Sequence, residues 1–485
     1  MREVFDHIVI GAGLGGLSTA CLLQNAGKHV LVLEAHNSVG GCASYFARKK
    51  FLFDVGATTL SGMKHDQPVQ RLLRTLRIDI DLQLCDPGMT IRMDGGVMDR
   101  WIDTSRWIAE CERIFGTAGQ RKFWTLVHST AESAWKASAS LKHLPLQSPR
   151  DLLSLPGMMR HASLVPALFR SVHDILSETG LAGNKDFVRF ISEQLMITAQ
   201  SDVHDTPFAV GAMGLAYPSD TWYVSGGMNN LPRILQKNLT ANGGSILLKK
   251  KAVSVEHGNV HKVTTDDGKI FYGRTIISNA TGWDNRKLIA DQEGYFDKEY
   301  SSLGGWGAFT GYYGVEDKQG FGEALYQQII LTSPLPYCGS NSIFLSFSAK
   351  DDHSRAPEGF RTLTVSTHVP DPAHWWKLSE RESSRRKQEI GNAMTAVLNT
   401  MLPDFEQAEK QVEMFGTPVT FANFTHRAFG QVGGVPQSMH RPLFLWPGSL
   451  TAQRGIYVVG DTIYPGQGAP GVILGALNLV ERLTE

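Results

Sequence analysis

The chain has 485 residues, of which 42% are hydrophobic and 19% are charged. This balance is typical of a globular protein and excludes an intrinsically disordered chain, and the length suggests two or three domains. Because 47 basic and 47 acidic residues cancel, the overall charge favours no nucleic-acid partner, and we expect none.

The cysteines and the apolar runs indicate the cellular compartment in which the protein works. Five cysteines without a C-x-x-C pair favour a reducing compartment over a disulfide framework, and we expect no metal site. No apolar run approaches the roughly 20 residues that span a bilayer, and no signal peptide is visible. We therefore expect a cytoplasmic protein that associates with a membrane only peripherally.

Residues 7–34 predict a strand, a glycine-rich turn, a helix and a second strand, in that order. The turn GAGLGG contains Gly11, Gly13, Gly15 and Gly16, and the second strand ends at Glu34, which Ala35 follows. In a dinucleotide fold, such glycines allow a tight turn and close approach to a pyrophosphate, and the acid accepts from a ribose hydroxyl. The alternative is a glycine-rich turn in an ordinary α/β protein.

The next residues favour FAD over NAD as the cofactor. Gly40 and Gly41, followed by Cys42 and Ala43, provide a second stretch of backbone suited to a long cofactor. A short strand over residues 51–55 then leads to Thr58, a polar residue that we place near the flavin ring. A plain loop turn is the alternative for the paired glycines.

The C-terminal end predicts a second half of the same site. Residues 456–459 have the pattern of a buried strand, which Gly460 and Asp461 end, and a helix is expected from Gly468 onward. Asp461 can accept from a ribitol hydroxyl. The backbone amides at the helix start, with Ala469 and Val472 close by, can face the flavin pyrimidine and stabilise negative charge there.

Together these segments resemble the phytoene desaturase and carotenoid isomerase family of FAD-dependent oxidoreductases, and more distantly the amine oxidases. The segments that carry the resemblance are GAGLGG, LEA, FDVGATT, GIYVVGD and PGQGAPGV, with YVSGGMNNL and TIISNA in the middle of the chain. The resemblance implies that backbone near Val253 lies along the adenine. Many desaturases of the family carry Arg where this chain has Cys42, so the chain looks closer to the isomerase, saturase and late-acting desaturase branches.

The pattern of elements predicts an α/β fold in three parts. We expect a Rossmann-like FAD-binding domain of the glutathione-reductase type, an antiparallel-sheet substrate domain, and a helical subdomain that contacts a membrane. The expected ranges are 1–70, 222–285 and 440–485 for the first, 71–104 and 286–439 for the second, and 105–221 for the third.

Within the helical part, residues 152–176 interleave apolar residues with Arg160, His161 and Arg170, and Arg150 lies just before them. Apolar residues on one side and cations on the other suit a membrane interface. The resembling family takes its substrate from membranes by such a segment. A pair of core-packing amphipathic helices is the alternative.

The resemblance implies a hydrophobic polyene substrate and an electron acceptor such as quinone or oxygen. Carotenoid desaturation is the expected reaction, with cis–trans isomerisation or a retinol-saturase-like reduction as alternatives. A second alternative is an amine oxidase, in which Trp306, Tyr312 and Tyr313 would form an aromatic cage. No catalytic residue is assigned, because Glu193 and Asp205, on the expected tunnel wall, are better explained as ordinary surface or structural residues.

Overall fold

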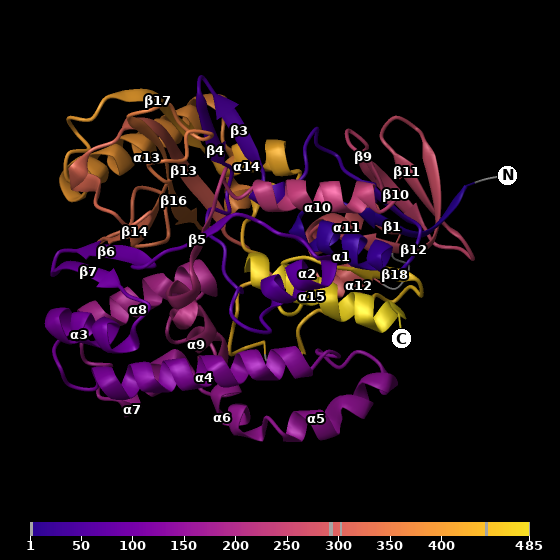
Figure 1. Ribbon diagram of the computed structural model, residues 1–485, viewed down its shortest axis with the longest axis horizontal. Helices are drawn as coiled ribbons and strands as arrows, with labels where there is room; N and C mark the ends of the chain where they lie inside the picture. Colours follow the sequence, from indigo (N-terminus) through magenta and orange to yellow (C-terminus); the bar gives the residue numbers. More distant parts are fainter. Residues whose placement is uncertain (1–2, 291–293, 301–302, 442–444, 485) are drawn as a thin grey trace.

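Two large β-sheets organise the chain, and a group of helices lies along one side of both (Figure 1). The computed structural model describes residues 3–290, 294–300, 303–441 and 445–484. Both termini lie on the side of the first sheet, so the N-terminal and C-terminal motifs come together in space (Figure 1).

The first sheet has a parallel part and an antiparallel part. The order is β10 (Ala252–Glu256), β11 (His261–Thr265), β12 (Ile270–Ser278), β1 (Val4–Ile10), β2 (Val30–Leu33) and β9 (Ser245–Leu247), with β18 (Ile456–Val458) on β12. Strands β12, β1, β2 and β9 run parallel, and so do β12 and β18. The strand β2, with sequence VLVL, is buried at every residue, as expected of a parallel strand covered on both faces.

Helices cover both faces of this sheet. One face packs against α1 (Leu14–Asn25), α2 (Pro68–Leu76), α10 (Asn230–Ala241) and α15 (Gly468–Thr484). The other face packs against α11 (Gly282–Leu288) and α12 (Tyr295–Tyr300). The helix α15 reaches from the sheet to the helical region, where Arg482 Nη2 lies 2.6 Å from Asp151 Oδ1.

The second sheet is antiparallel except where β14 meets β6. Its order is β17 (Lys410–Gly416), β13 (Gly307–Glu316), β16 (Phe360–Val369), β15 (Ser342–Phe347), β14 (Tyr326–Ile330), β6 (Met89–Met93) and β7 (Gly96–Arg100). Residues alternate along each strand, so that Phe309, Leu345 and Val365 pack in a core beside the long helix α13 (Glu380–Met401). The opposite face of the sheet is free to line a cavity.

The helical region follows β7 in the chain and precedes the other five strands of the second sheet. Its elements are α3 (Thr104–Phe115), α4 (Gln120–Ser140), α5 (Leu155–Met159), α6 (Val165–Leu168), α7 (Val172–Glu178), α8 (Lys185–Thr198) and α9 (Phe208–Ala216). Large aromatic residues fill its core, among them Trp107, Trp124 and Phe187. None of the helices in the described ranges combines the length and apolar character that crossing a membrane requires.

The fold class expected from the sequence is confirmed: a Rossmann-like sheet is joined to an antiparallel sheet and a helical part. The domain boundaries stay a prediction. One hairpin joins neither large sheet, because β3 (Tyr45–Arg48) and β4 (Phe51–Asp54) pair only with each other in the described part of the chain. Phe51 and Phe53 pack beside Tyr312 of the second sheet. A segment that we assigned to the FAD-binding part therefore bridges to the substrate part.

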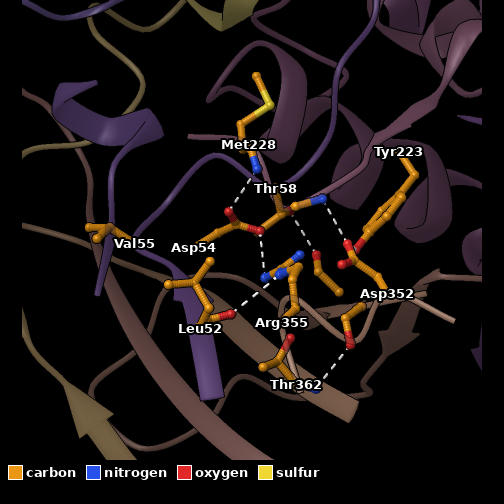
Figure 2. Close-up of polar contacts among 12 residues, drawn as sticks. Leu52, Asp54, Val55, Thr58, Tyr223, Met228, Asp352, Arg355 and Thr362 are labelled. Atoms are coloured by element: carbon orange, nitrogen blue, oxygen red, sulfur yellow. Dashed lines mark hydrogen bonds and ion pairs between the residues drawn. The ribbon is translucent and has the colours of Figure 1, made fainter. Parts of the chain in front are cut away.

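A buried ion pair fixes this bridge (Figure 2). Asp54 Oδ2 lies 2.8 Å from Arg355 Nη2, and both side chains are at most 5% exposed. The other oxygen of Asp54 accepts from the backbone N–H of Met228 at 2.9 Å, and Arg355 Nε donates to the carbonyl of Leu52. The pair thereby joins β4, the start of α10 and the segment between β15 and β16.

A second carboxylate extends the same network. Asp352 Oδ2 accepts from the hydroxyl of Tyr223 at 2.6 Å and from the backbone N–H of Gly226 at 2.8 Å (Figure 2). Tyr223 belongs to β8 (Trp222–Val224), which pairs with β5 (Leu82–Leu84). Three segments that are distant in sequence are thus held by two carboxylates and one guanidinium.

We expect Arg355→Met to lower the free energy of unfolding by about 3–5 kcal/mol, because Asp54 is left as a buried, unpaired carboxylate. Burial raises the pKa of Asp54 and Arg355 lowers it, so the substitution raises that pKa further. A carboxyl whose pKa is raised in the folded state favours folding more as it becomes protonated. The difference in free energy of unfolding between wild type and variant should therefore shrink as the pH falls. Urea titrations at several pH values measure both effects.

Lys350→Met is the matched control, because Lys350 forms an exposed ion pair with Glu323 in the same segment. Exposed pairs contribute at most about 1 kcal/mol. A deficit of the same size in both variants would contradict the structural role of the buried pair.

Candidate functional site

One continuous cavity of about 1110 Å³ lies between the two sheets and the helical region. Its volume lies above the roughly 300–1,000 Å³ typical of a pocket for one small molecule. One part is lined by the glycine-rich segments of the first sheet, and the other by the helices. The cavity therefore has room for a cofactor and a substrate together.

The first glycine turn forms an open cradle at the start of α1. Gly13 precedes the helix with no side-chain cap, so the first backbone N–H groups of α1 are left for a ligand. The side chain of Asn279 fills the space behind the turn. A Cβ atom on Gly13 would lie 2.7 Å from Asn279 Nδ2, and one on Gly15 would lie 2.8 Å from Asn279 Oδ1.

Glu34 lies at the end of β2, beside this turn. Its Oε2 accepts from the N–H of Ala12 at 2.6 Å, and its Oε1 accepts from the N–H of His36 at 2.7 Å. Burial raises the pKa of Glu34, and these backbone donors lower it. A carboxylate has about four acceptor sites, so two stay available for the hydroxyls of a ribose.

The second glycine segment lies directly against the first. The N–H of Gly40 donates to the carbonyl of Ala12 at 2.9 Å, with Gly40 at a φ of 120° that favours glycine. Asn229, at the start of α10, donates its amide to the carbonyls of Val39 and Ala43. Buried Asn229 therefore fixes the shape of this loop from the outside.

The C-terminal half of the site is centred on an ion pair. Arg427 Nη2 lies 2.9 Å from Asp461 Oδ2, and both side chains are at most 18% exposed. Burial lowers the pKa of Arg427, but Asp461, Cys42 and Asp284 together raise it above its usual value. Burial also raises the pKa of Cys42, and Arg427 lowers it, so the Cys42 thiol lies near the same pair.

The helical part of the cavity has mostly apolar walls. They come from α4, α6, α8, α9 and the residues next to them, and include Trp135, Leu141, Leu164, Leu168, Ile197 and Met213. The segment of residues 152–176, which we call the docking segment, supplies part of this wall and part of the outer surface. Met159 on its outer side is 77% exposed.

Relatives of this chain are found over nearly its whole length. It is 27% identical to prolycopene isomerase 1, chloroplastic, from an Oncidium hybrid cultivar, over 99% of this chain and 84% of that protein. It is 24% identical to the neurosporene-forming phytoene desaturase of Cereibacter sphaeroides, over 98% of this chain and 94% of that protein. Residues 9–76 match the family described as NAD(P)-binding Rossmann-like domain. Over nearly its whole length the chain is therefore similar to carotenoid desaturases and isomerases.

Solved structures share the fold of this chain. An oxidoreductase from Methanosarcina mazei aligns over 98% of this chain and 99% of its own, with a TM-score of 0.65 and 17% identity. Putrescine oxidase bound to putrescine aligns over 100% and 99%, with a TM-score of 0.65 and 15% identity. The fold and the relatives together make the chain a flavin-type oxidoreductase.

The structure brings together the residues that the sequence predicted as cofactor contacts. All of them line the cavity except Gly16. The lining residues are Gly11, Gly13, Gly15, Glu34, Ala35, Gly40, Gly41, Cys42, Ala43, Thr58, Val253, Gly460, Asp461, Gly468, Ala469 and Val472. Their contact with a cofactor stays a prediction. Gly16 has a packing role, because its Cβ would lie 2.1 Å from the carbonyl oxygen of Gly11.

Other candidates lie outside the cavity. Glu193 is buried and accepts from Ser340, Asn341 and Ser342, which is a structural role. Asp205 accepts from the hydroxyl of Ser438.

The aromatic cage of an amine oxidase is not formed by Trp306, Tyr312 and Tyr313, which are absent from the described residues that line the cavity. Tyr312 donates its hydroxyl to the carbonyl of Val55, and Tyr313 packs in the core beside α13.

Sequence reasoning missed three residues of the site. Asn279 ends the TIISNA strand, and only the packing shows that it fills the glycine turn. Arg427 pairs with Asp461 at the cavity wall, and no sequence motif indicates this pairing. Gln200 also lines the cavity, and no motif surrounds it.

We expect Gly16→Ala to destabilise the protein by about 1–3 kcal/mol, although alanine normally stabilises a helix interior. The added Cβ would overlap the carbonyl of Gly11, so the glycine turn must shift. Gly157→Ala is the control: Gly157 lies in α5, and its nearest neighbour would be 3.8 Å away. Thermal unfolding of both variants measures the difference. Equal stability of the two variants would show that the turn is not tightly packed.

Proposed function

We propose that this chain binds FAD non-covalently and acts on a long isoprenoid polyene as a carotenoid oxidoreductase. The observation that carries the proposal is the single cavity, which joins a dinucleotide cradle to an apolar chamber. A polyene has no charged group to orient it, so its binding must come from apolar burial, at about 0.8 kcal/mol per CH₂. The walls contributed by the helices suit such a ligand.

The cradle fits FAD along its whole length. We assign the adenosine end to Glu34 and Val253, the pyrophosphate to the start of α1, and the ribitol to Asp461. The flavin ring then lies between Thr58 and the start of α15. The positive end of that helix favours negative charge on the pyrimidine.

Bound FAD would supply the hydride acceptor, and quinone or oxygen would serve as the final acceptor. The chain's own residues orient the polyene, exclude water and set the charge around the ring. Arg427 contributes a permanent positive charge near the assigned position of the flavin ring, and the negative charge of Asp461 balances it.

Two reactions on the same substrate are supported. The overall pattern of motifs favours desaturation, in which a carbon–carbon single bond of the polyene loses a hydride and a proton. Isomerisation is favoured by the relatives named prolycopene isomerase, which match 99% of this chain.

We expect the purified protein to be yellow and to release free FAD on denaturation. Glu34→Ala should weaken FAD binding about 10- to 100-fold and leave FMN binding unchanged, because FMN lacks the adenosine ribose. The loss matches a hydrogen bond to a charged acceptor, about 1.5–3 kcal/mol. Titration of apoprotein with each flavin measures the two affinities.

Glu256→Ala is the control for this titration, since Glu256 lies on the exposed part of β10 and pairs with Lys262. Equal retention of FAD by Glu34→Ala and Glu256→Ala would refute the assigned role of Glu34.

Expression in bacteria that accumulate different carotenoids should separate the two reactions. Desaturation lowers the mass of the pigment by two hydrogens per step and shifts its absorption to the red. Isomerisation changes chromatographic retention at constant mass. If every carotenoid stays unchanged while a water-soluble amine is oxidised, the chain is an amine oxidase instead.

We also propose that the docking segment contacts an anionic lipid bilayer and admits the substrate from it. Exposed apolar residues cluster there: Leu152, Met159, Val165 and Phe169 are 48–77% exposed. On the same segment Met158 and Leu164 line the cavity, so a short path connects the outer surface to the chamber. Arg160 is exposed, whereas Arg170 pairs with Glu178 at 2.8 Å. The side chain of Arg150 lies outside the described residues.

Met159→Glu combined with Arg160→Glu should therefore reduce co-sedimentation with anionic vesicles by tenfold or more, with FAD content unchanged. Each surface cation contributes about 1 kcal/mol on anionic lipid, and loss of apolar contact adds to this. Val260→Glu is the control, because Val260 is an exposed apolar residue in the turn between β10 and β11. Unchanged sedimentation of the double variant would contradict the docking assignment.

A further inference from the structure

The sheet that forms one wall of the cavity presents polar side chains to it. Along β16, Leu363 and Val365 pack in the core beside α13, whereas Ser366 and His368 line the cavity. From the neighbouring strands β15 and β14, Ser342 and Tyr326 also line it. A hydrocarbon alone would favour apolar residues at these positions.

Some of these groups are satisfied within the protein and others are not. Ser342 donates to Glu193 at 2.9 Å, and Tyr326 donates to the carbonyl of Thr58 at 2.9 Å. Within the described ranges, the Ser366 hydroxyl and the His368 ring have no hydrogen-bond partner, and both residues are half-buried. Burial lowers the pKa of His368 to about 4, so at pH 7 its neutral ring offers one donor and one acceptor.

Gln200, just after α8, adds an unpaired acceptor to the cavity lining. Its Nε2 donates to the carbonyl of Val432 at 2.6 Å, while its Oε1 is buried with no partner in the described part of the chain. Gln200 is 3% exposed and lines the cavity, with a φ of 55° that costs energy for any residue except glycine. Such strain is retained where the side chain must point in one direction.

Trp306 places Gln200 and His368 near each other. Its Nε1 donates to the backbone carbonyl of Gln200 at 3.2 Å, and its ring centre lies 6.1 Å from that of His368. A Cβ on Gly433 would lie within 2.3 Å of both Gln200 and Gln467, so the group also borders the start of α15. Gln200, Ser366 and His368, which we call the polar triad, therefore face the cavity next to the assigned position of the flavin.

We propose that the polar triad binds a hydroxyl group on the polyene, so that the substrate is an alcohol and not a plain hydrocarbon. The proposal rests on the proposed function. Gln200 Oε1 only accepts, and it therefore needs a ligand that donates, which a carbonyl does not. Ser366 and His368 can in turn donate to the hydroxyl oxygen. One alcohol group thus matches the unpaired groups of the triad.

The test compares three polyenes of equal length in the flavin-loaded protein: a hydrocarbon, a terminal alcohol and the corresponding ketone. Affinities are read from perturbation of the flavin spectrum. We expect the alcohol to bind at least tenfold more tightly than the other two. Ser366→Ala and His368→Phe should each lower this preference about tenfold without weakening the hydrocarbon. Thr364→Val, a substitution on the same strand outside the cavity lining, should leave the preference unchanged.

Equal affinities of the wild type for alcohol and hydrocarbon would overturn the proposal. So would variants that change the flavin spectrum without ligand but keep the preference, because the triad would then serve the cofactor. Tight binding of the alcohol without any chemical change would support the triad assignment and refute the proposed function. Turnover of the hydrocarbon with no preference for the alcohol would refute the triad assignment and support the proposed function.

Discussion

The packing around the cavity depends on the buried pairing of Asp54 with Arg355, because this pair ties the β3–β4 hairpin to the segment between β15 and β16 of the second sheet. The carboxylate also accepts from the start of α10, so one interaction sets the position of the hairpin, the helix and the second sheet. Two buried charges are expensive to desolvate, and apolar residues of the same size can stabilise a fold equally well. An ion pair adds direction, since a guanidinium and a carboxylate fit together in few orientations.

Close packing at the glycine turn plays the complementary role on the cofactor side. Asn279 occupies the space that side chains on Gly13 or Gly15 would need, and Gly16 lets α1 approach the turn. Glu34 is held by two backbone donors before any ligand arrives. The polar groups of the cradle are therefore already oriented, and binding a cofactor costs little reorganisation.

Local motifs were predictable from the sequence, and contacts between distant segments were not. GAGLGG, Glu34 and Asp461 follow directly after strands or turns, so their place at the cavity could be inferred from chain order. Arg427 faces Asp461 only because a long loop returns to the first sheet.

The same limit applies to the wall of the substrate chamber. The direction of Gln200 depends on Trp306 and Val432, which lie more than 100 residues away. The sequence predicted an antiparallel sheet in this part of the chain, but which face of β16 meets the cavity is decided by the position of α13. Likewise, the aromatic residues of the β3–β4 hairpin predicted an apolar strand. They did not indicate that this strand packs beside the second sheet.

The helix α15 sets the distance between the cavity and the residues just before the docking segment. It begins at the cavity and, 17 residues later, ends near Arg482, which is tied to Asp151 just before the docking segment. At 1.5 Å per residue, the helix spans roughly 25 Å. Inserting a single residue would turn its far end by about 100° and carry Arg482 away from its partner. The length of α15 is thus constrained at both ends, by the cavity at Gly468 and by the ion pair at Arg482.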